Sequence, residues 1–383
     1  MIIDHIIKKI KLCLPIKYSE FQIHEPTFDK RDISNIKKCV ESTFVSTKGC
    51  YIDSFTSKLK NITGCKKILL TSSGTSALFL ALKAIDIDSC EVLLPSMTFV
   101  ATANAVVNAN GIPNFIDSSE TSLNLCPIKL EEYLSDIAIV KNKKCINKNT
   151  GRVIKVLMVV HTYGDPVDLL SIKKITEKYC LEVIEDGAGA LGSYQNKKHI
   201  GITNRLSILS FNGNKIITTG MGGAILFKNN DDYENIKHLI STARVPHNWK
   251  VEHDQVGYNL KMANINAALG DSQLSRIKEI LKYKRNLYLR YQNAFEEDDY
   301  CFLHESKKTD KPNHWVTNIY LKNKYKKYHQ DLIKALHKEK ILVREIWKPQ
   351  HLNKMYRRMP KSSLTNSVIH WKTGISLPSS YYK

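Results

Sequence analysis

The sequence predicts an α/β protein whose large, mainly parallel sheet is covered by helices on both faces and is followed by a small α+β domain. Apolar strand-like runs alternate with helical runs through most of the chain, which is the pattern of a parallel sheet with crossover helices. Near the C-terminus this pattern changes to a strand-like VTNIYLKN, a helix-like YHQDLIKALHKEK and a strand-like ILVREI. The chain has 383 residues, enough for two domains with cores of their own. In the large domain, strands are expected to end at Leu70, Leu94, Ile116, Val160, Ile184, Leu209 and Phe227.

Three parts are predicted along the chain: a lead-in segment over residues 1–26, a large domain over 27–261, and a bridging helix with a small domain over 262–383. The lead-in segment mixes apolar pairs with lysines and lacks the apolar core of a secretory signal, which predicts an amphipathic helix. A weak contact with a membrane surface is the alternative for this basic segment. From Met262 to Leu281, apolar residues recur at helical spacing, which predicts one long helix between the domains.

The formal net charge of +20 brings nucleic-acid binding into consideration. The basic residues are spread over the chain, so we expect no nucleic-acid partner, and part of the charge can draw an anionic substrate toward its cleft. Nine cysteines occur without a CxxC pair, which favours the reduced thiols of a cytoplasmic protein and predicts no metal site. No apolar run approaches the ~20 residues that cross a bilayer, so no membrane insertion is expected.

A hydroxyl-rich turn follows the first strand of the large domain in LLTSSGTSALFLALKAI, residues 69–85. It opens an apolar helical run, where free backbone N–H groups and the helix dipole favour an anion. The hydroxyls of Ser73, Thr75 and Ser76 add donors, so the turn is a candidate phosphate site. Helix capping is the alternative function of these residues. No Walker lysine follows, which excludes a nucleotide P-loop.

Phe99 stands in the turn after the next strand, within LLPSMTFVATANAVVNANGIPNFID, residues 93–117. An aromatic ring at such a strand end can lie flat on a planar ligand and fix its tilt through dispersion and quadrupole interactions. A place in the hydrophobic core is the alternative for Phe99 when this residue is taken alone.

An acidic residue ends a later strand, in VIEDGAGALG, where Asp186 precedes a run of small residues. A carboxylate at that place can keep a pyridine nitrogen protonated, so that the ring accepts the electron pair of a broken C–H bond. An Asp that follows a strand and precedes small residues is also a common helix N-cap. The two interpretations of Asp186 carry equal weight on this segment alone.

Lys215 lies in SFNGNKIITTGMGG, residues 210–223, between an apolar strand and a turn crowded with glycines. A lysine in a partly dehydrated pocket can lose its proton and attack an aldehyde to form a Schiff base. The glycines of this turn let the backbone pass close to a bound ligand. An ordinary loop lysine is the alternative, and the upstream segments favour the cofactor role.

Together, in this order and spacing, these segments resemble the DegT/StrS family of nucleotide-sugar aminotransferases, which use pyridoxal 5′-phosphate (PLP) and have fold type I, the aspartate aminotransferase fold. The resemblance covers nearly the whole chain. It is closest to the branch that acts on UDP-4-keto-6-deoxy-N-acetylglucosamine in bacillosamine and legionaminic acid pathways. The runs that carry it are HEPTFDKRDISNIKKCVESTFVSTKG from His24, HTYGDP from His161, FNGNKIITTG from Phe211 and TARVPHNWKVEHDQVGYNLKMANINAALG from Thr242.

The resemblance implies a role for each matched cofactor residue. Lys215 would bind the cofactor covalently and move protons, Asp186 would pair with the ring nitrogen, and Phe99 would cover one ring face. Asn259 would reach the phosphate bound by the neighbouring subunit, which implies a homodimer with shared active sites. The residues implied around the phosphate within one subunit are Gly74, Thr75, Ser76 and Ser210.

The resemblance also implies the substrates and the reaction. L-glutamate would give its amino group and the C4 ketone of a UDP-linked sugar would receive it, in a ping-pong transamination that supplies amino sugars for surface glycans. Keto sugars linked to dTDP or GDP are the alternative acceptors. The substrate-binding residues that the resemblance implies are His161, Tyr163, His247, Trp249, Trp315 and Trp347.

Three positions depart from the family pattern. Gly189 stands where related chains carry Gln or Glu, Met221 replaces a Gly or Glu, and Lys261 replaces a frequent Arg. These exchanges leave a non-enzymatic sensor or scaffold on the same fold as a second class of function. A sugar 3-dehydratase built on the same scaffold carries His at the lysine position, and Lys215 argues against it.

Overall fold

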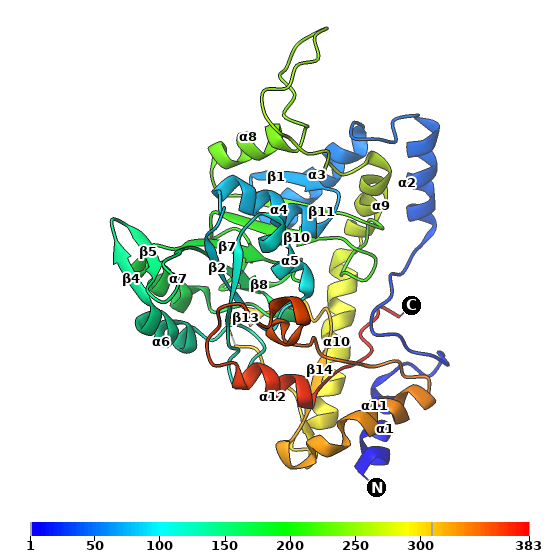
Figure 1. Cartoon of the computed structure of the whole chain (residues 1–383). Helices are drawn as coiled ribbons and strands as arrows, with labels where there is room; N and C mark the ends of the chain where they lie inside the picture. Colours follow the sequence, from blue (N-terminus) through cyan, green and yellow to red (C-terminus); the bar gives the residue numbers. More distant parts are fainter. Residues whose placement is uncertain (1, 308, 383) are drawn as a thin grey trace.

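The computed structural model describes residues 2–307 and 309–382, and its main feature is a large sheet with the order β1-β11-β10-β7-β6-β2-β3 (Figure 1). Strands β3, β2, β6, β7 and β10 run parallel to one another. A hairpin of β4 and β5 extends the sheet beside β6. The bounds are β1 Lys67–Thr71, β2 Glu91–Pro95, β3 Ile112–Ile116, β4 Ala138–Lys141, β5 Lys144–Asn147, β6 Val153–Val160, β7 Glu182–Asp186, β10 Leu206–Ser210 and β11 Gly223–Phe227.

The predicted α/β class and the mainly parallel sheet are confirmed, and the predicted strand ends fall within two residues of the observed ones. Strand β11 is antiparallel to both of its neighbours, β10 and β1. The connection over residues 211–222 contains no helix, so the chain turns back at the end of β10 instead of crossing over the sheet. This turn carries Lys215 to the carboxyl end of β10.

Helices cover both faces of the sheet. Adjacent residues of β10 show this, because Ile208 packs in one core cluster with α4, α5 and α8, whereas Leu209 packs in another with α3 and α9. A further cluster joins α6 and α7 to β2 and β6. The bounds are α2 Lys30–Glu41, α3 Cys50–Thr63, α4 Gly74–Ile85, α5 Val100–Asn108, α6 Pro127–Ile137, α7 Leu169–Lys178, α8 Asn230–Leu239 and α9 Asn264–Leu274.

The C-terminal part contains an antiparallel sheet with the order β12-β14-β16-β15, packed against α10 and α11. The predicted lead-in helix is α1 (Ile2–Cys13), which lies beside α10 and α11 in Figure 1. Its Ile6 and Ile10 are fully buried there, so this apolar face is covered by the chain itself. The bounds are α10 Ile277–Phe295, β12 Cys301–Phe302, β14 Asn318–Leu321, α11 His329–Lys338, β15 Arg344–Glu345, α12 Thr365–Thr373 and β16 Gly374–Ser376.

A third, small sheet of β8 (Tyr194–Gln195), β9 (Lys198–His199) and β13 (Asp310–Lys311) links the two parts. Strand β13 belongs to the C-terminal part, and it pairs with β8, which belongs to the part of the chain that forms the large sheet. Within the described residues, no helix is long and apolar enough to span a membrane.

The single helix predicted from Met262 to Leu281 is wrong, because the structure has two helices, α9 and α10, with a break at Ser275 and Arg276. Arg276 is 3% exposed, and its guanidinium donates to Asp32 at 2.8 Å and to the Thr27 carbonyl at 3.1 Å. Apolar spacing continues through the break, so periodicity alone could not show it. A buried ion pair fixes the point at which α9 ends and α10 begins.

Replacing Arg276 with Met is expected to lower the free energy of unfolding by about 3–5 kcal/mol, because the Asp32 carboxylate stays buried without its cation. Arg31→Met is the matched control. Arg31 also pairs with an Asp, but its side chain is 60% exposed, so we expect a much smaller loss. Urea unfolding followed by circular dichroism measures both losses, and equal losses would contradict the role given to the buried pair.

Candidate active site

A cavity of about 340 Å³ opens at the carboxyl ends of the parallel strands. Strands β6, β7 and β10 each bring their last residue to it, and the turn before α4 closes one side. Open α/β sheets bind ligands at this edge. The predicted site residues that line the cavity are Gly74, Thr75, Phe99, His161, Asp186, Ser210, Lys215, Trp315 and Trp347.

The N-terminus of α4 forms the candidate phosphate site. Ser73 caps the helix by accepting a hydrogen bond from the backbone N–H of Ser76 at 3.0 Å, so capping and a phosphate role coexist in this turn. The first N–H groups of a helix lack intrahelical partners and favour an anion. Gly74 is required by close approach, since a Cβ there would lie 2.8 Å from the Ser210 Cβ. The Ser76 hydroxyl bonds to Ser72 and Ser73, at 3.0 and 2.9 Å, and lies outside the cavity lining.

Asp186 ends β7 and lies 4% exposed on the cavity wall. Its carboxylate accepts hydrogen bonds from the Thr102 hydroxyl at 2.8 Å and from the Ala188 N–H at 3.0 Å. Burial raises the pKa of Asp186, although these donors and the charge of Lys215 act in the opposite direction. The residues after Asp186 form a turn and not a helix, so the N-cap interpretation is wrong.

Thr102 is a residue that sequence analysis missed. It lies one turn into α5 and its hydroxyl also contacts the Thr98 hydroxyl at 2.8 Å. Thr98 precedes the helix, whose N-cap is Phe99, so helical periodicity in the sequence does not link Thr98 to Thr102. Nothing in the sequence indicated that Thr102 meets the end of β7.

Lys215 follows a turn in which its backbone N–H donates to the Asn212 carbonyl at 3.0 Å. Burial lowers the pKa of Lys215 to about 7, against the opposing effect of the Asp186 carboxylate. The amine lies 3.6 Å from the centre of the Trp315 ring. A lysine that is partly neutral at pH 7 can act as a nucleophile and as a base, which the loop-lysine interpretation does not explain.

The pH dependence of cofactor uptake follows from this pKa. A lysine attacks an aldehyde only in its neutral form, which predominates above the pKa of the amine. We therefore expect the initial rate of PLP uptake by the cofactor-free protein to rise with pH through a midpoint near 7, the pKa of Lys215. Stopped-flow absorbance measures that rate. A midpoint near the ordinary lysine pKa of about 10.4 would contradict the burial of the amine.

His161 lines the cavity with its imidazole turned into the protein. Its Nδ1 accepts from the Val167 N–H at 3.1 Å, so Nε2 carries the proton and donates to Glu185 at 3.1 Å. Burial acts to raise the pKa of Glu185. The hydrogen bonds that its carboxylate accepts from His161, Asn204 and the Gly201 N–H outweigh this effect and lower the pKa. His161 therefore forms a fixed part of the cavity wall beside Asp186. Its backbone N–H also donates a hydrogen bond to the Asp186 carbonyl.

An adjoining cavity of about 290 Å³ shares Phe99, Trp315 and Trp347 with the first. Tyr163 lines this adjoining cavity and not the first, and its ring stacks on Trp347 with 4.2 Å between the ring centres. Its hydroxyl accepts a hydrogen bond from the Trp347 N–H at 3.2 Å. His24 also lines this adjoining cavity, and both nitrogens of its ring are buried without a hydrogen-bond partner. Aromatic faces beside polar groups are typical of a site for a bulky, partly polar substrate.

Besides Ser76, three predicted residues lie outside both cavities, and all three belong to the long segment between α8 and α9, part of which extends away from the body of the molecule in Figure 1. Trp249 is 79% exposed and its ring contacts His247 edge-on at 4.7 Å. Asn259 is exposed, next to Leu260, whose carbonyl accepts from the Ser72 N–H at 2.7 Å. Of the residues that depart from the family pattern, Met221 lines the first cavity, and Lys261 forms a backbone bridge with Thr71 of β1.

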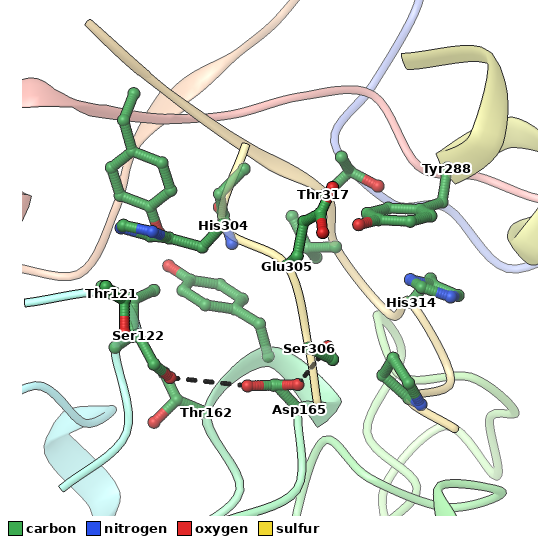
Figure 2. A pocket seen from close by; sticks show the side chains of 16 residues that line it. Thr121, Ser122, Thr162, Asp165, Tyr288, His304, Glu305, Ser306, His314 and Thr317 are labelled. Atoms are coloured by element: carbon green, nitrogen blue, oxygen red, sulfur yellow. Dashed lines mark hydrogen bonds between the residues drawn. The ribbon is translucent and has the colours of Figure 1, made fainter. Parts of the chain in front are cut away.

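A separate cavity of about 80 Å³ borders the far side of Tyr163, and Figure 2 shows Asp165 between Ser122 and Ser306 on its wall. Both hydroxyls donate to the Asp165 carboxylate, at 3.5 and 2.5 Å, and burial raises the pKa of Asp165 to about 6. Tyr163 is the only predicted site residue in its lining. No group of His, Cys, Asp and Glu in the described part of the chain is arranged to hold a metal ion.

The residues of the first cavity fit PLP. They offer an anion site at the start of α4, a buried carboxylate for the ring nitrogen, a partly neutral lysine amine and an aromatic ring. The glycine at position 74 leaves room that a side chain would fill.

Sequence comparison leads to the same class of enzyme. GDP-perosamine synthase of Vibrio cholerae is 32% identical over 93% of this chain and 93% of that protein. The UDP-4-amino-4,6-dideoxy-N-acetyl-beta-L-altrosamine transaminase of Campylobacter jejuni is 30% identical over 91% of this chain and 90% of that protein. These relatives carry different nucleotides in their names, so they support a sugar aminotransferase without fixing the nucleotide.

The fold comparison agrees. The solved structure of Helicobacter pylori PseC, an aminotransferase involved in the biosynthesis of pseudoaminic acid, has a TM-score of 0.84 and 26% identity, with 94% of this chain and 93% of that chain covered. The expected fold type I is therefore confirmed, and the protein is a PLP-dependent sugar aminotransferase. Since the profile of the DegT/DnrJ/EryC1/StrS aminotransferase family matches residues 26–381, the chain belongs to that family.

Proposed function

We propose that the enzyme moves the amino group of L-glutamate to the C4 ketone of a UDP-linked 2-acetamido-2,6-dideoxy-4-keto-hexose. The observation that carries the site assignment is the convergence of Lys215, Asp186 and the start of α4 on one cavity. The UDP sugar is supported by the long matched runs of the sequence and by the Campylobacter jejuni relative. The Vibrio cholerae relative favours a GDP-linked sugar as the second candidate.

Each residue has a distinct part in this proposal. When bound, PLP supplies an electron sink for the pair released when a C–H bond next to the transferred nitrogen breaks. Lys215 holds and moves the proton of that carbon, because its amine is buried in the cavity and is partly neutral at pH 7. Asp186 holds a proton on the ring nitrogen. Phe99 orients the ring, and Gly74, Thr75 and Ser210 bind the phosphate with the N-terminus of α4.

The adjoining cavity is the proposed place of the sugar. It meets the cofactor cavity along Trp315 and Trp347, so a sugar bound there reaches Lys215 without passing through solvent. The rings of Phe99, Trp315 and Trp347 line both cavities and offer apolar surface to the C–H face of a hexose. Walls of this kind exclude water from the reacting carbon, which strengthens the electrostatic effect of the nearby charges.

A homodimer completes the proposal. His247, Trp249 and Asn259 belong to the segment between α8 and α9 and line neither of the two cavities described above. In the proposed dimer this segment brings Asn259 to the phosphate site and the other two residues to the nucleotide of the partner. The enzyme is assigned to the cytoplasm in this proposal, which the nine unpaired cysteines support.

The first experiment separates an enzyme from a sensor or scaffold. The yellow absorbance of the PLP-loaded protein is expected to bleach on addition of L-glutamate and to return with a 4-keto sugar nucleotide. UDP-, GDP- and dTDP-linked 4-keto sugars are then compared, with kcat/KM expected to favour UDP by at least about tenfold. A scaffold would not respond to glutamate, and a preference for GDP would replace the UDP assignment while leaving the reaction in place.

A further inference from the structure

The indole of Trp315 contacts Lys215 at two points. Its ring centre lies 3.6 Å from the lysine amine, within the distance at which a cation over an aromatic face is attracted to it. Its Nε1–H donates to the carbonyl of Asn214, the residue just before Lys215, at 2.6 Å. One side chain therefore contacts both the amine and the backbone that carries it.

Trp315 is itself held firmly. It is 4% exposed, and its backbone N–H donates to the Asn313 side chain at 2.9 Å. Its carbonyl accepts from Lys284, a lysine of α10 that is 1% exposed, at 3.0 Å. Burying a lysine amine is costly unless the amine forms hydrogen bonds, so the bond from Lys284 to this carbonyl is required for the fold. Through this bond, α10 fixes the position of Trp315.

Gly189 provides the space that the Trp315 ring occupies. A Cβ at position 189 would lie 2.5 Å from Cε3 of the ring, closer than side-chain atoms approach one another. The Asn313 side chain also donates to the Gly189 carbonyl at 2.8 Å, so it links the glycine to the tryptophan backbone. Any side chain at position 189 and the observed place of the indole are therefore mutually exclusive.

We propose that Trp315 is a positioning residue for Lys215 and that Gly189 is the exchange that admits its ring. The proposal rests on the cofactor role given to Lys215 and deepens it: the face of an indole lies beside the reacting amine, in space that a glycine leaves open. The ring favours the protonated amine, which opposes the effect of burial. The hydrogen bond to the Asn214 carbonyl fixes the direction from which the amine enters the cavity.

The test compares PLP uptake, followed by stopped-flow absorbance across the neutral pH range, in four variants of the full-length cofactor-free protein. Trp315→Leu removes both contacts, and we expect its limiting uptake rate to fall by about tenfold. Gly189→Gln keeps the tryptophan but displaces its ring, and we expect the same fall. Trp315→Phe keeps a ring face and loses the Nε1–H, with an expected fall of about threefold. Trp371→Leu, in α12 and outside both cavities, is expected to match the wild type.

The outcomes are distinct. Wild-type rates in Trp315→Leu would overturn the positioning role, and a wild-type rate in Gly189→Gln would overturn the part given to the glycine. Gly189→Ala is a smaller step toward the same clash, and it serves in place of Gly189→Gln if thermal unfolding shows that the larger variant fails to fold. Lys215→Ala is measured alongside: if borohydride reduction still fixes PLP covalently to this variant as it does to the wild type, the cofactor role of Lys215 fails, which is a different result from any of those above.

Discussion

Lys215→Ala is expected to abolish amino transfer, with a loss of at least about 10³-fold in turnover, because the variant lacks both the amine that binds the cofactor covalently and the base that moves the proton. The variant is expected to keep noncovalent affinity for the cofactor, since the start of α4, Asp186 and Phe99 remain in place. Equilibrium dialysis with PLP and a coupled assay of 2-oxoglutarate formation measure the two properties separately.

Lys228→Ala is the control for that experiment. Lys228 lies just beyond β11, and its amine donates to the Thr203 carbonyl at 3.0 Å on the exposed surface, away from both cavities. We expect wild-type turnover from this variant. Turnover by Lys215→Ala near that of Lys228→Ala would contradict the assignment of the reactive lysine, even with the family established.

The residues that the sequence located well are those placed by the ends of strands. Within three residues of the end of a buried apolar strand lie Asp186, Ser210 and Gly74. The hydrophobic pattern of such a strand predicts where it ends, and so places these residues at the edge of the sheet. The family resemblance then supplied their roles. The structure shows that these three residues line one cavity, which no periodicity could establish because they come from distant segments.

What the sequence did not predict depends on contacts between segments of unlike pattern. Thr102, near the start of α5, meets Asp186 at the end of β7 across 84 residues of sequence. The break at Arg276 follows from an ion pair with Asp32, far away in the chain. Gly189 was recognised as a departure, but its consequence required the place of the Trp315 ring. Side-chain packing between distant elements carries this information, and local propensity does not.

Asp186 carries a conflict between stability and function that the structure makes measurable. Burial raises the pKa of its carboxyl group, so ionising this group costs more free energy in the folded protein than in the unfolded chain. A group of this kind contributes less stability as the pH rises through its folded pKa. In its ionised form the buried Asp186 therefore lowers the stability of the cofactor-free protein, as expected of a functional residue.

Asp186→Asn separates the two effects. The amide keeps the shape of the carboxylate, and its oxygen can still accept from the Ala188 N–H. Its NH₂ can donate to the Thr102 hydroxyl, which can donate in turn to Thr98. We therefore expect a cofactor-free variant at least as stable as the wild type in urea. Turnover is expected to fall by about 10²–10³-fold, because an amide does not stabilise a proton on the ring nitrogen.

Thr102→Val is the matched comparison, since it removes one hydrogen bond to Asp186 and leaves the carboxylate in place. A loss of about fivefold is expected from this variant, the value of one ordinary hydrogen bond. If Asp186→Asn lost no more turnover than Thr102→Val, the carboxylate would serve only to order the wall of the cavity. If it lost turnover together with stability, the fall would reflect damage to the fold, and the conflict inferred for this residue would be absent.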